Sequence, residues 1–273
     1  MKFPHLFTKL FCSPIALRDV ERNAFEAYLL NRIQAPTHQA SEHIRTGNER
    51  TESILSRFGD VGIVKIHGVI DKRISQAEME CYGGCDLADV DAALSILASD
   101  ATISTVVLDV NSPGGSVVGV PETAARIAAI AETKEVHAFI DVMACSAGYW
   151  LASQADKITA NPSAIVGSVG VYMAILDASR MMEDEGLRLQ MIKAGKFKDL
   201  GSSHRPLTDE ETAMLQADVD KLHANFRAAV NAKRTIPNEA TEGQWMNAGD
   251  SIQFGLVDEL TNANLDEFVA SLI

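Results

Sequence analysis

The stretch EVHAFIDVMACSAGYWLASQADKITA, residues 135–160, predicts the class of the fold. The apolar run 135–143 favours a buried strand, and the residues that follow, 146–155, favour a helix. Residues 157–160 then predict a second strand. Because a strand, a helix and a strand follow one another so closely, we expect a parallel pair of strands covered by the helix.

The same alternation continues on both sides of this stretch. Strands are expected at 61–70, 104–110, 169–174 and 187–194, and helices at 87–100 and 119–132 with a short one after 174. A long helix is expected over 208–233, because Thr208 and Glu211 form a capping box at its start. Its expected buried stripe is Leu215, Val219, Leu222, Phe226 and Val230. The pattern predicts an α/β fold with a mostly parallel sheet.

The N-terminal part of the chain has a different pattern. Residues 17–33 carry apolar side chains at helical spacing and predict an amphipathic helix. Residues 34–53 are polar without periodicity and predict a linker. We therefore expect a helical arm and linker over residues 1–58, followed by one domain over residues 59–273.

Composition narrows the class of protein. The formal net charge of −13 disfavours a phosphate backbone, so we expect no nucleic-acid partner. No window is apolar enough for a signal peptide or a membrane span, which predicts a cytoplasmic protein without a transmembrane anchor. Cys81 and Cys85 lack a second Cys or His pair to complete a zinc site, so we expect a reduced surface loop and neither metal nor other cofactor.

Ser146 lies between small residues at an expected strand-to-helix junction, where a nucleophile would be accessible to a peptide. The N–H of Ala147 would point out of the helix N-terminus, and glycines in the turn at 113–115 would let the N–H of Gly115 approach the same oxyanion. Each such donor contributes about 3 kcal/mol in comparable enzymes. The alternatives are a helix N-cap at Ser146, a turn without a ligand at 113–115, and Cys145 as the nucleophile.

A nucleophilic serine needs a base. His137, His204 and His223 do not lie in segments that pair convincingly with Ser146. The segment 191–203 offers lysines instead, at positions 193, 196 and 198. A lysine base must be neutral, and burial lowers a lysine pKa by about 3 to 5 units. The base is therefore expected to be the lysine that lies in a dry, apolar site.

Four motifs resemble the signal peptide peptidase A family of serine peptidases, including its phage prohead-protease branch. They are NSPGGSV, ACSAGYWLASQADKITANPSAIVGSVGV, IKAGKFKDLGSSHRPLTDEE and GLVDEL, and the resemblance runs from about Gly62 to Leu260. It implies the Clp protease and crotonase type of fold, a layered β/α spiral, and a serine endopeptidase with a Ser-Lys dyad.

The resemblance also implies residue roles. Ser146 takes the position of the nucleophile, and Lys198 that of the base, because the family's lysine directly precedes an acidic residue; Lys196 is the rival. Ser168 takes the position of the serine that helps to hold the lysine. Gly115 and Ala147 take the oxyanion-hole positions.

The family forms ring or dome homo-oligomers. We expect a phage or prophage capsid-maturation protease that acts on scaffold or portal proteins, in the host cytoplasm or inside the prohead. Substrate side chains near the cut are expected to be small or apolar. The alternatives are a soluble bacterial housekeeping peptidase, a crotonase-like acyl-CoA enzyme with a carboxylate such as Glu122, and a non-catalytic capsid-assembly module.

Overall fold

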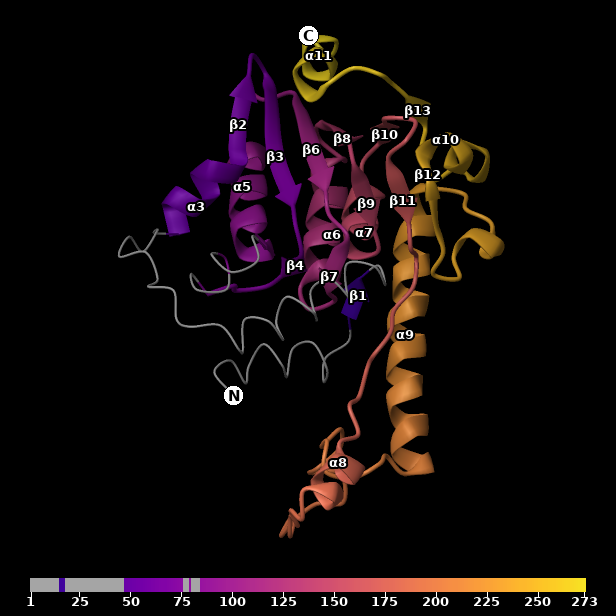
Figure 1. Ribbon diagram of the computed structural model, residues 1–273. Helices are drawn as coiled ribbons and strands as arrows, with labels where there is room; N and C mark the ends of the chain where they lie inside the picture. The colour runs from indigo at the N-terminus through magenta and orange to yellow at the C-terminus, as the bar shows by residue number, and fades with distance from the viewer. Residues whose placement is uncertain (1–14, 18–46, 76–78, 80–83) are drawn as a thin grey trace.

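The computed structural model describes residues 15–17, 47–75, 79 and 84–273, and its centre is a six-stranded sheet (Figure 1). The strand order is β13 (Glu259–Leu260), β10 (Lys157–Ala160), β8 (Glu135–Ile140), β6 (Thr105–Asn111), β3 (Val61–His67) and β2 (Leu55–Phe58). Neighbouring strands are parallel except β2 and β3, which are antiparallel. The predicted α/β class with a mostly parallel sheet is confirmed.

Three helices pack in a row against this sheet: α5 (Leu87–Ser99), α6 (Val120–Ile130) and α7 (Ala147–Ala152). One face of α5 is buried in the main hydrophobic core, as Leu87 and Leu94 illustrate. A separate small core forms where α11 (Leu265–Ala270) packs on the sheet, with Phe268 stacked on Phe139 at 5.0 Å between ring centroids.

Two smaller sheets continue the carboxyl ends of the central strands. One has the order β1 (Ile15–Leu17), β7 (Gly114–Ser116), β4 (Ile70–Asp71) and β5 (Cys85–Asp86). The other has the order β12 (Trp245–Asn247), β11 (Ile165–Gly167) and β9 (Met143–Cys145). Because β4, β7 and β9 directly follow β3, β6 and β8, the loops of the motifs lie together at one edge of the sheet.

A long helix, α9 (Asp209–Lys233), leads away from the sheet, and Figure 1 shows α8 (Ser179–Asp184) at its far end. The predicted capping box of Thr208 and Glu211 is confirmed. In the expected stripe, Phe226 and Val230 are buried, whereas Leu215, Val219 and Leu222 are only half-buried. Only the C-terminal half of α9 therefore packs fully on the body. We call residues 174–215 the arm.

Two predicted strands are wrong. Residues 169–174 form no strand, since the strand of this region is β11, and residues 187–194 form an irregular exposed segment. Leu187, Leu189 and Ile192 are all exposed there. An alternating apolar pattern becomes a strand only beside a strand that pairs with it, and no sheet within the described residues reaches these segments.

The helix expected at 17–33 and the linker expected at 34–53 lie mostly outside the described residues. Leu17 lies in the strand β1, and residues 18–33 of the expected helix lie outside the described residues. The predicted linker 34–53 is wrong from residue 47, where α3 (Gly47–Ile54) begins; residues 34–46 are not described. Arg50 anchors this helix to the start of α5, with Asp86 at 3.4 Å and Asp89 at 3.2 Å. Ion pairs thus order a segment that lacks apolar periodicity. The domain boundary at residue 59 stays a prediction.

Cys85 does not lie in a surface loop, as was expected. It is a free, buried thiol in β5, and its burial raises its pKa to about 12, while Cys81 lies outside the described residues. Within the described ranges, no group of three or more His, Cys, Asp or Glu side chains could hold a metal ion. None of the helices that the structure describes is long and apolar enough to cross a bilayer.

Candidate active site

Ser146 lies at the junction of β9 and α7 in a conformation that side chains rarely adopt, with φ 52° and ψ −120°. Its N–H donates to the carbonyl of Gly167 at 2.8 Å, because β9 and β11 pair in register up to Cys145 and Gly167. A positive φ outside glycine costs about 1 to 3 kcal/mol and persists only where the surroundings hold it. The sheet therefore fixes the backbone of Ser146.

The hydroxyl of Ser146 is almost fully buried and donates a long hydrogen bond, 3.4 Å, to the carbonyl of Gly170. Ser146 is the N-cap residue of α7 by position, as the alternative expects, but its side chain makes no capping bond to the helix within the described part of the chain. Cys145, the rival nucleophile, is fully buried in β9, and its Sγ lies 3.7 Å from the carbonyl oxygen of Ile165. Ser146 is thus the better placed of the two nucleophiles.

The turn before β7 lies directly beside this junction. The N–H of Ser112 donates to Met143 and its carbonyl accepts from the N–H of Cys145, both at 3.0 Å, so the ends of β6 and β9 are joined. Three residues later, Gly115 passes so close to β4 that a Cβ there would lie 1.9 Å from the carbonyl oxygen of Ile70. Only glycine fits at this position.

Ala147 begins α7 on the other side of the same turn. The first bond inside the helix runs from the N–H of Trp150 to the carbonyl of Ser146, so the helix itself does not use the N–H of Ala147. Gly148 lies against Ser112, where a Cβ would meet the Ser112 side chain at 3.0 Å. The structure therefore brings α7 and β7, with the two expected oxyanion-hole residues, to one place.

Ser168 lies beside Ser146 for a reason of register. It follows Gly167, the partner of Cys145 across the parallel pair of β9 and β11, as Ser146 follows Cys145. It also has a positive φ, 53°, and its N–H donates to the carbonyl of Gln244 at 2.7 Å. The proximity of Ser146 and Ser168 thus follows from the pairing of two short strands.

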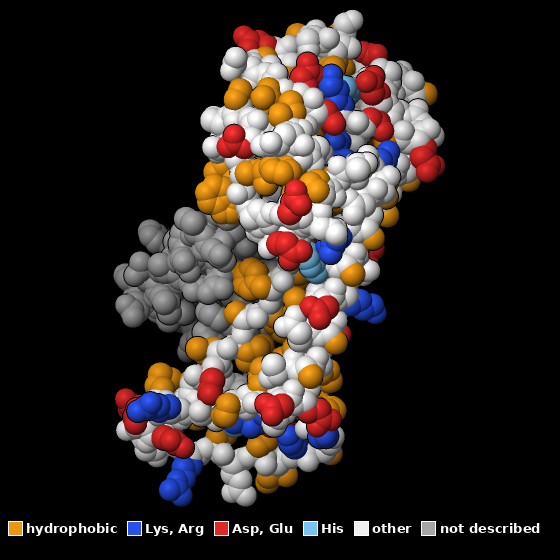
Figure 2. Space-filling model, turned by 90° about the vertical axis from the view of Figure 1, so that its right-hand side faces the viewer, with side chains coloured by type: hydrophobic (Ala, Val, Ile, Leu, Met, Phe, Trp, Pro, Cys, Tyr) orange, Lys and Arg blue, Asp and Glu red, His pale blue; other side chains and the backbone are white. Residues whose placement is uncertain are grey.

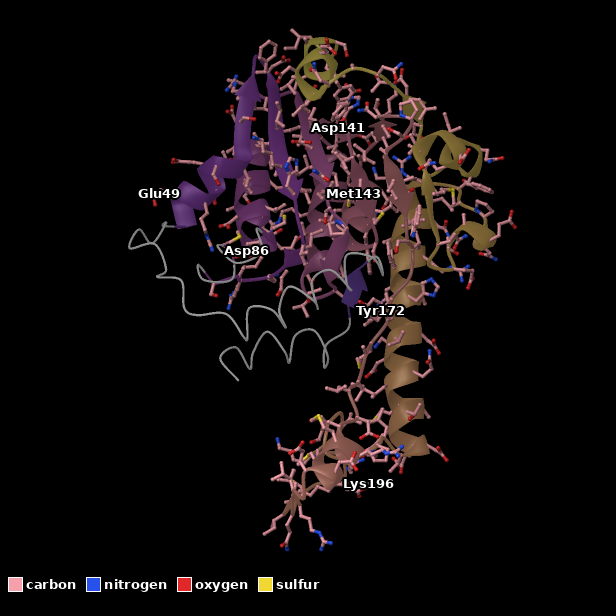
Figure 3. The ribbon with its side chains drawn as sticks, viewed as in Figure 1. Glu49, Asp86, Asp141, Met143, Tyr172 and Lys196 are labelled. Atoms are coloured by element: carbon pink, nitrogen blue, oxygen red, sulfur yellow. The ribbon has the colours of Figure 1, made fainter. Side chains whose placement is uncertain are left out.

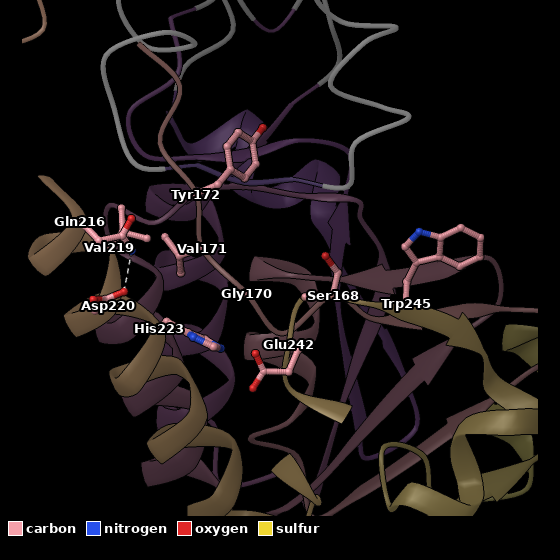
Figure 4. A pocket seen from close by; sticks show the side chains of 11 residues that line it. Ser168, Gly170, Val171, Tyr172, Gln216, Val219, Asp220, His223, Glu242 and Trp245 are labelled. Atoms are coloured by element: carbon pink, nitrogen blue, oxygen red, sulfur yellow. Dashed lines mark hydrogen bonds between the residues drawn. The ribbon is translucent and has the colours of Figure 1, made fainter. Parts of the chain in front are cut away.

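A pocket of about 320 Å³ opens beside Ser168 and Gly170 (Figure 4). Its walls come from the chain after β11, from α9 and from the loop before β12; the lining residues are Ser168, Gly170, Val171, Tyr172, Gln216, Val219, Asp220, His223, Glu242, Gly243 and Trp245. His223 bonds through Nε2 to the carbonyl of Thr241 at 2.8 Å. Sequence reasoning missed this pocket, because its walls are assembled from segments far apart along the chain.

The three candidate lysines lie elsewhere, in the arm. Lys193 pairs with Asp199 and Lys196 with Glu210, whereas Lys198 is exposed and forms no ion pair with the described residues. Figure 3 shows Lys196 at the end of the arm and Met143, close to Ser146 in sequence, in the body.

The loop that carries Lys198 is held by an ion network. Arg205 contacts Asp199 at 3.0 Å and Glu211 at 2.7 Å. Hydrogen bonds from Arg205, with a further one from Lys193, hold the pKa of Asp199 well below its usual range. Those from Arg205 and from the Thr208 N–H lower the pKa of Glu211 to about 2. The end of the arm is therefore organised by charge and not by an apolar core.

The length of α9 separates the two groups of residues. Glu211 belongs to the network at the end of the arm, and Phe226 stacks on Trp150 of α7 with 4.4 Å between ring centroids. At 1.5 Å per residue, this part of the helix spans about 22 Å. The pairing of β9 with β11 and the contacts of α7 with β7 bring together Ser146, Ser168, Gly115 and Ala147. The loop of Lys198 is held at the other end of this part of α9, through the ion pair of Arg205 with Glu211. Glu122, the carboxylate of the acyl-CoA alternative, is exposed in the first turn of α6.

Comparisons with known proteins agree with the motifs. A model of peptidase family S49 matches residues 128–272. A putative protease of Methanocaldococcus jannaschii is 34% identical over 61% of this chain and 55% of its own length. The capsid assembly protease C of Escherichia phage lambda is 27% identical over 95% of this chain and 63% of its own length. The chain thus spans less than two thirds of the length of these relatives.

Solved structures give weaker matches. An enoyl-CoA hydratase from Shewanella pealeana aligns with a TM-score of 0.45 at 10% identity, covering 84% of this chain and 75% of that one. The family match covers more than half of the residues, including both serines and the lysine loop. The chain belongs to peptidase family S49.

Proposed function

We propose that this chain is a serine endopeptidase in which Ser146 is the nucleophile and Lys198 the base. The observation that carries the proposal is the convergence of Ser146, Gly115 and Ala147 at one edge of the sheet. Lys198 takes the proton of the Ser146 hydroxyl, whose oxygen attacks the carbonyl carbon of the peptide. The N–H groups of Gly115 and Ala147 receive the oxyanion. The C–N bond then breaks, the amine leaves with a proton, and water hydrolyses the acyl-enzyme.

The lysine comes from a second copy of the chain in this proposal. Within one chain α9 holds Lys198 far from Ser146, and Lys198 has no ion-pair partner among the described residues, in contrast to Lys193 and Lys196. Docking of the arm onto another copy would place Lys198 beside Ser146 and Ser168, in a site from which water is excluded. Burial there would favour the neutral amine that the reaction needs.

The surface of the arm supports this assembly. Large apolar side chains are exposed along it, and Figure 2 shows apolar patches on the arm. These residues are Leu176, Met181, Leu187, Leu189, Met191 and Ile192, the last with 91% of its surface exposed. Such clusters mark surfaces that bind other proteins. We therefore propose a homo-oligomer in which each arm supplies the base of a neighbouring site.

For the physiological role, we propose maturation of a phage or prophage capsid, with scaffold or portal proteins as substrates. Support comes from the similarity to the capsid assembly protease C, which extends over 95% of the chain. The second candidate is a bacterial housekeeping peptidase. A role outside phage is favoured by the higher identity of the putative protease of Methanocaldococcus jannaschii. A non-catalytic assembly module would not need the strained backbone that Ser146 keeps.

A mixing experiment tests the dyad and its assembly together. Ser146→Ala and Lys198→Ala are each expected to lose cleavage of labelled casein. When the two variants are mixed and allowed to exchange subunits, about a quarter of the sites would combine an intact serine with an intact lysine from a neighbour, as a head-to-tail interface requires. Activity should return to about that fraction of the wild-type rate.

Lys196→Ala is the matched control and should keep most of the activity. Cleavage that persists in Lys198→Ala and vanishes in Lys196→Ala would assign the base to Lys196. No recovery on mixing, in variants that demonstrably exchange subunits, would contradict a dyad formed between copies.

A further inference from the structure

The strand β7, which carries Gly115, has both of its edges occupied. On one edge it pairs in parallel with β4 through Gly115 and Ile70. On the other edge it pairs with β1, residues 15–17 of the same chain, in antiparallel register, with Ala16 opposite Gly115 (Figure 1). The chain's own N-terminal segment thus lies as an extended strand beside the expected oxyanion-hole residue.

This edge is where a peptide substrate would be held. An extended peptide binds to an exposed strand by completing its ladder of main-chain hydrogen bonds, and neighbouring strands lie about 4.8 Å apart. The turn that leads into β7 is bonded to the Cys145 backbone, directly before Ser146. A peptide paired with β7 therefore passes the junction that carries the nucleophile.

We propose that residues 15–17 occupy the substrate strand position of the active site and act as a built-in competitor of peptide substrates. The inference rests on the proposed peptidase function, because it takes β7 as the substrate-holding strand. It goes beyond that function in naming the occupant, a segment of this chain, and its effect, a lower activity until the segment is displaced. Since the contact is made by the backbone, it requires an extended segment more than it requires particular side chains.

Proline substitutions in β1 test the competition in the full chain. Alternate residues of an antiparallel strand donate to the same neighbour, so either Ala16 or both flanking residues donate to β7. Proline removes the N–H donor. We therefore compare Ala16→Pro with the double variant Ile15→Pro and Leu17→Pro. At least one is expected to cleave casein about three- to tenfold faster than the wild type, the effect of losing one or two ordinary hydrogen bonds.

Binding provides a readout that needs no turnover. A fluorescent peptide SPIALRDV, the sequence of residues 13–20, is titrated into Ser146→Ala protein with and without the proline substitutions, and a scrambled peptide serves as control. Displacing the competitor should tighten peptide binding about three- to tenfold. Gln253→Ala, in the exposed 3-10 helix Ile252–Phe254 and far from β7 in the sequence, should change neither measurement.

The outcomes separate the two proposals. The competitor proposal is contradicted if the peptide binds equally tightly to protein with and without the proline substitutions. It is also contradicted if the scrambled peptide binds as tightly as SPIALRDV. Either result would hold even if casein is cleaved in a Ser146-dependent way. Tighter peptide binding in the proline variants supports the competitor, even if no variant cleaves casein, a result that would count against the peptidase function. A Ser146-dependent cut of the chain itself within residues 13–20, seen by intact mass, supports it as well, because it requires the same pose.

Discussion

The body around Ser146 and the arm around Lys198 are held by different forces. In the body, hydrogen bonds between short strands fix Ser146 and Ser168, and α7 and α9 are joined by the stacked rings of Trp150 and Phe226. In the arm, apolar side chains are exposed, and the buried groups are the carboxylates of Asp199 and Glu211 with Arg205 between them. The body is held by an apolar core, whereas the arm exposes apolar side chains around a network of charges. Substitutions in the two regions should therefore have separable effects.

Gly115→Ala is expected to have the largest effect. The new Cβ would lie 1.9 Å from the Ile70 carbonyl oxygen, so β7 must shift, and the N–H that would receive the oxyanion moves with it. Loss of one such donor costs about 100- to 1,000-fold in kcat. We expect casein cleavage to fall at least that far, measured at a temperature where the variant is folded by circular dichroism. Ser116→Ala, one residue further along β7, is the control, and an equal loss there would contradict the argument.

Phe226→Ala probes the body end of α9. The ring is fully buried and stacked on Trp150, so its removal should cost about 3 to 5 kcal/mol of unfolding free energy, measured by urea denaturation. Met214→Ala, near the arm end of the same helix, should cost less than about 0.5 kcal/mol because Met214 is exposed. Equal costs at the two positions would show that arm and body are stabilised alike.

Arg205→Lys probes the arm with the smallest expected change. Lysine keeps the charge but loses the fork that reaches Asp199 and Glu211 together. Casein cleavage should fall about three- to tenfold through displacement of the Lys198 loop, by the strength of one or two hydrogen bonds. The thermal midpoint of the body should stay unchanged. A fall in that midpoint as large as the one in Phe226→Ala would contradict a separate role of the network.

The same network gives the arm a pH dependence. Because Glu211 has its pKa lowered to about 2 from an ordinary 4.5, the unfolded arm takes up a proton before the folded arm does as the pH falls. The stabilisation by Glu211 is therefore full above about pH 4.5 and is lost as the pH falls toward 2. Amide protection factors in residues 193–211, which correct for the slower intrinsic exchange at lower pH, should fall over this range, and less so in Arg205→Lys.

Much of the body could be predicted from the sequence. Strands such as β6 and β8 and the helix α5 appear as apolar runs of the right length and period, and Thr208 with Glu211 marks the start of α9 by local chemistry alone. A shared oxyanion site for Gly115 and Ala147, beside Ser146, was expected from small residues at two turns, and Ser168 entered only through the resemblance. The predictions of strands at 169–174 and 187–194 are wrong, because an alternating apolar pattern indicates an apolar face but does not show whether a neighbouring strand pairs with it.

By itself the sequence determined which residues are candidates for chemistry and which segments form the sheet, because apolar period, capping residues and small residues at a turn act locally. Only the tertiary structure decided that Ser146 adopts a positive φ and that residues 15–17 lie beside Gly115. It also decided that about 22 Å of α9 lies between Glu211, in the network of the arm, and Phe226, which packs on α7. These features depend on contacts between segments far apart in the chain, which no local pattern encodes.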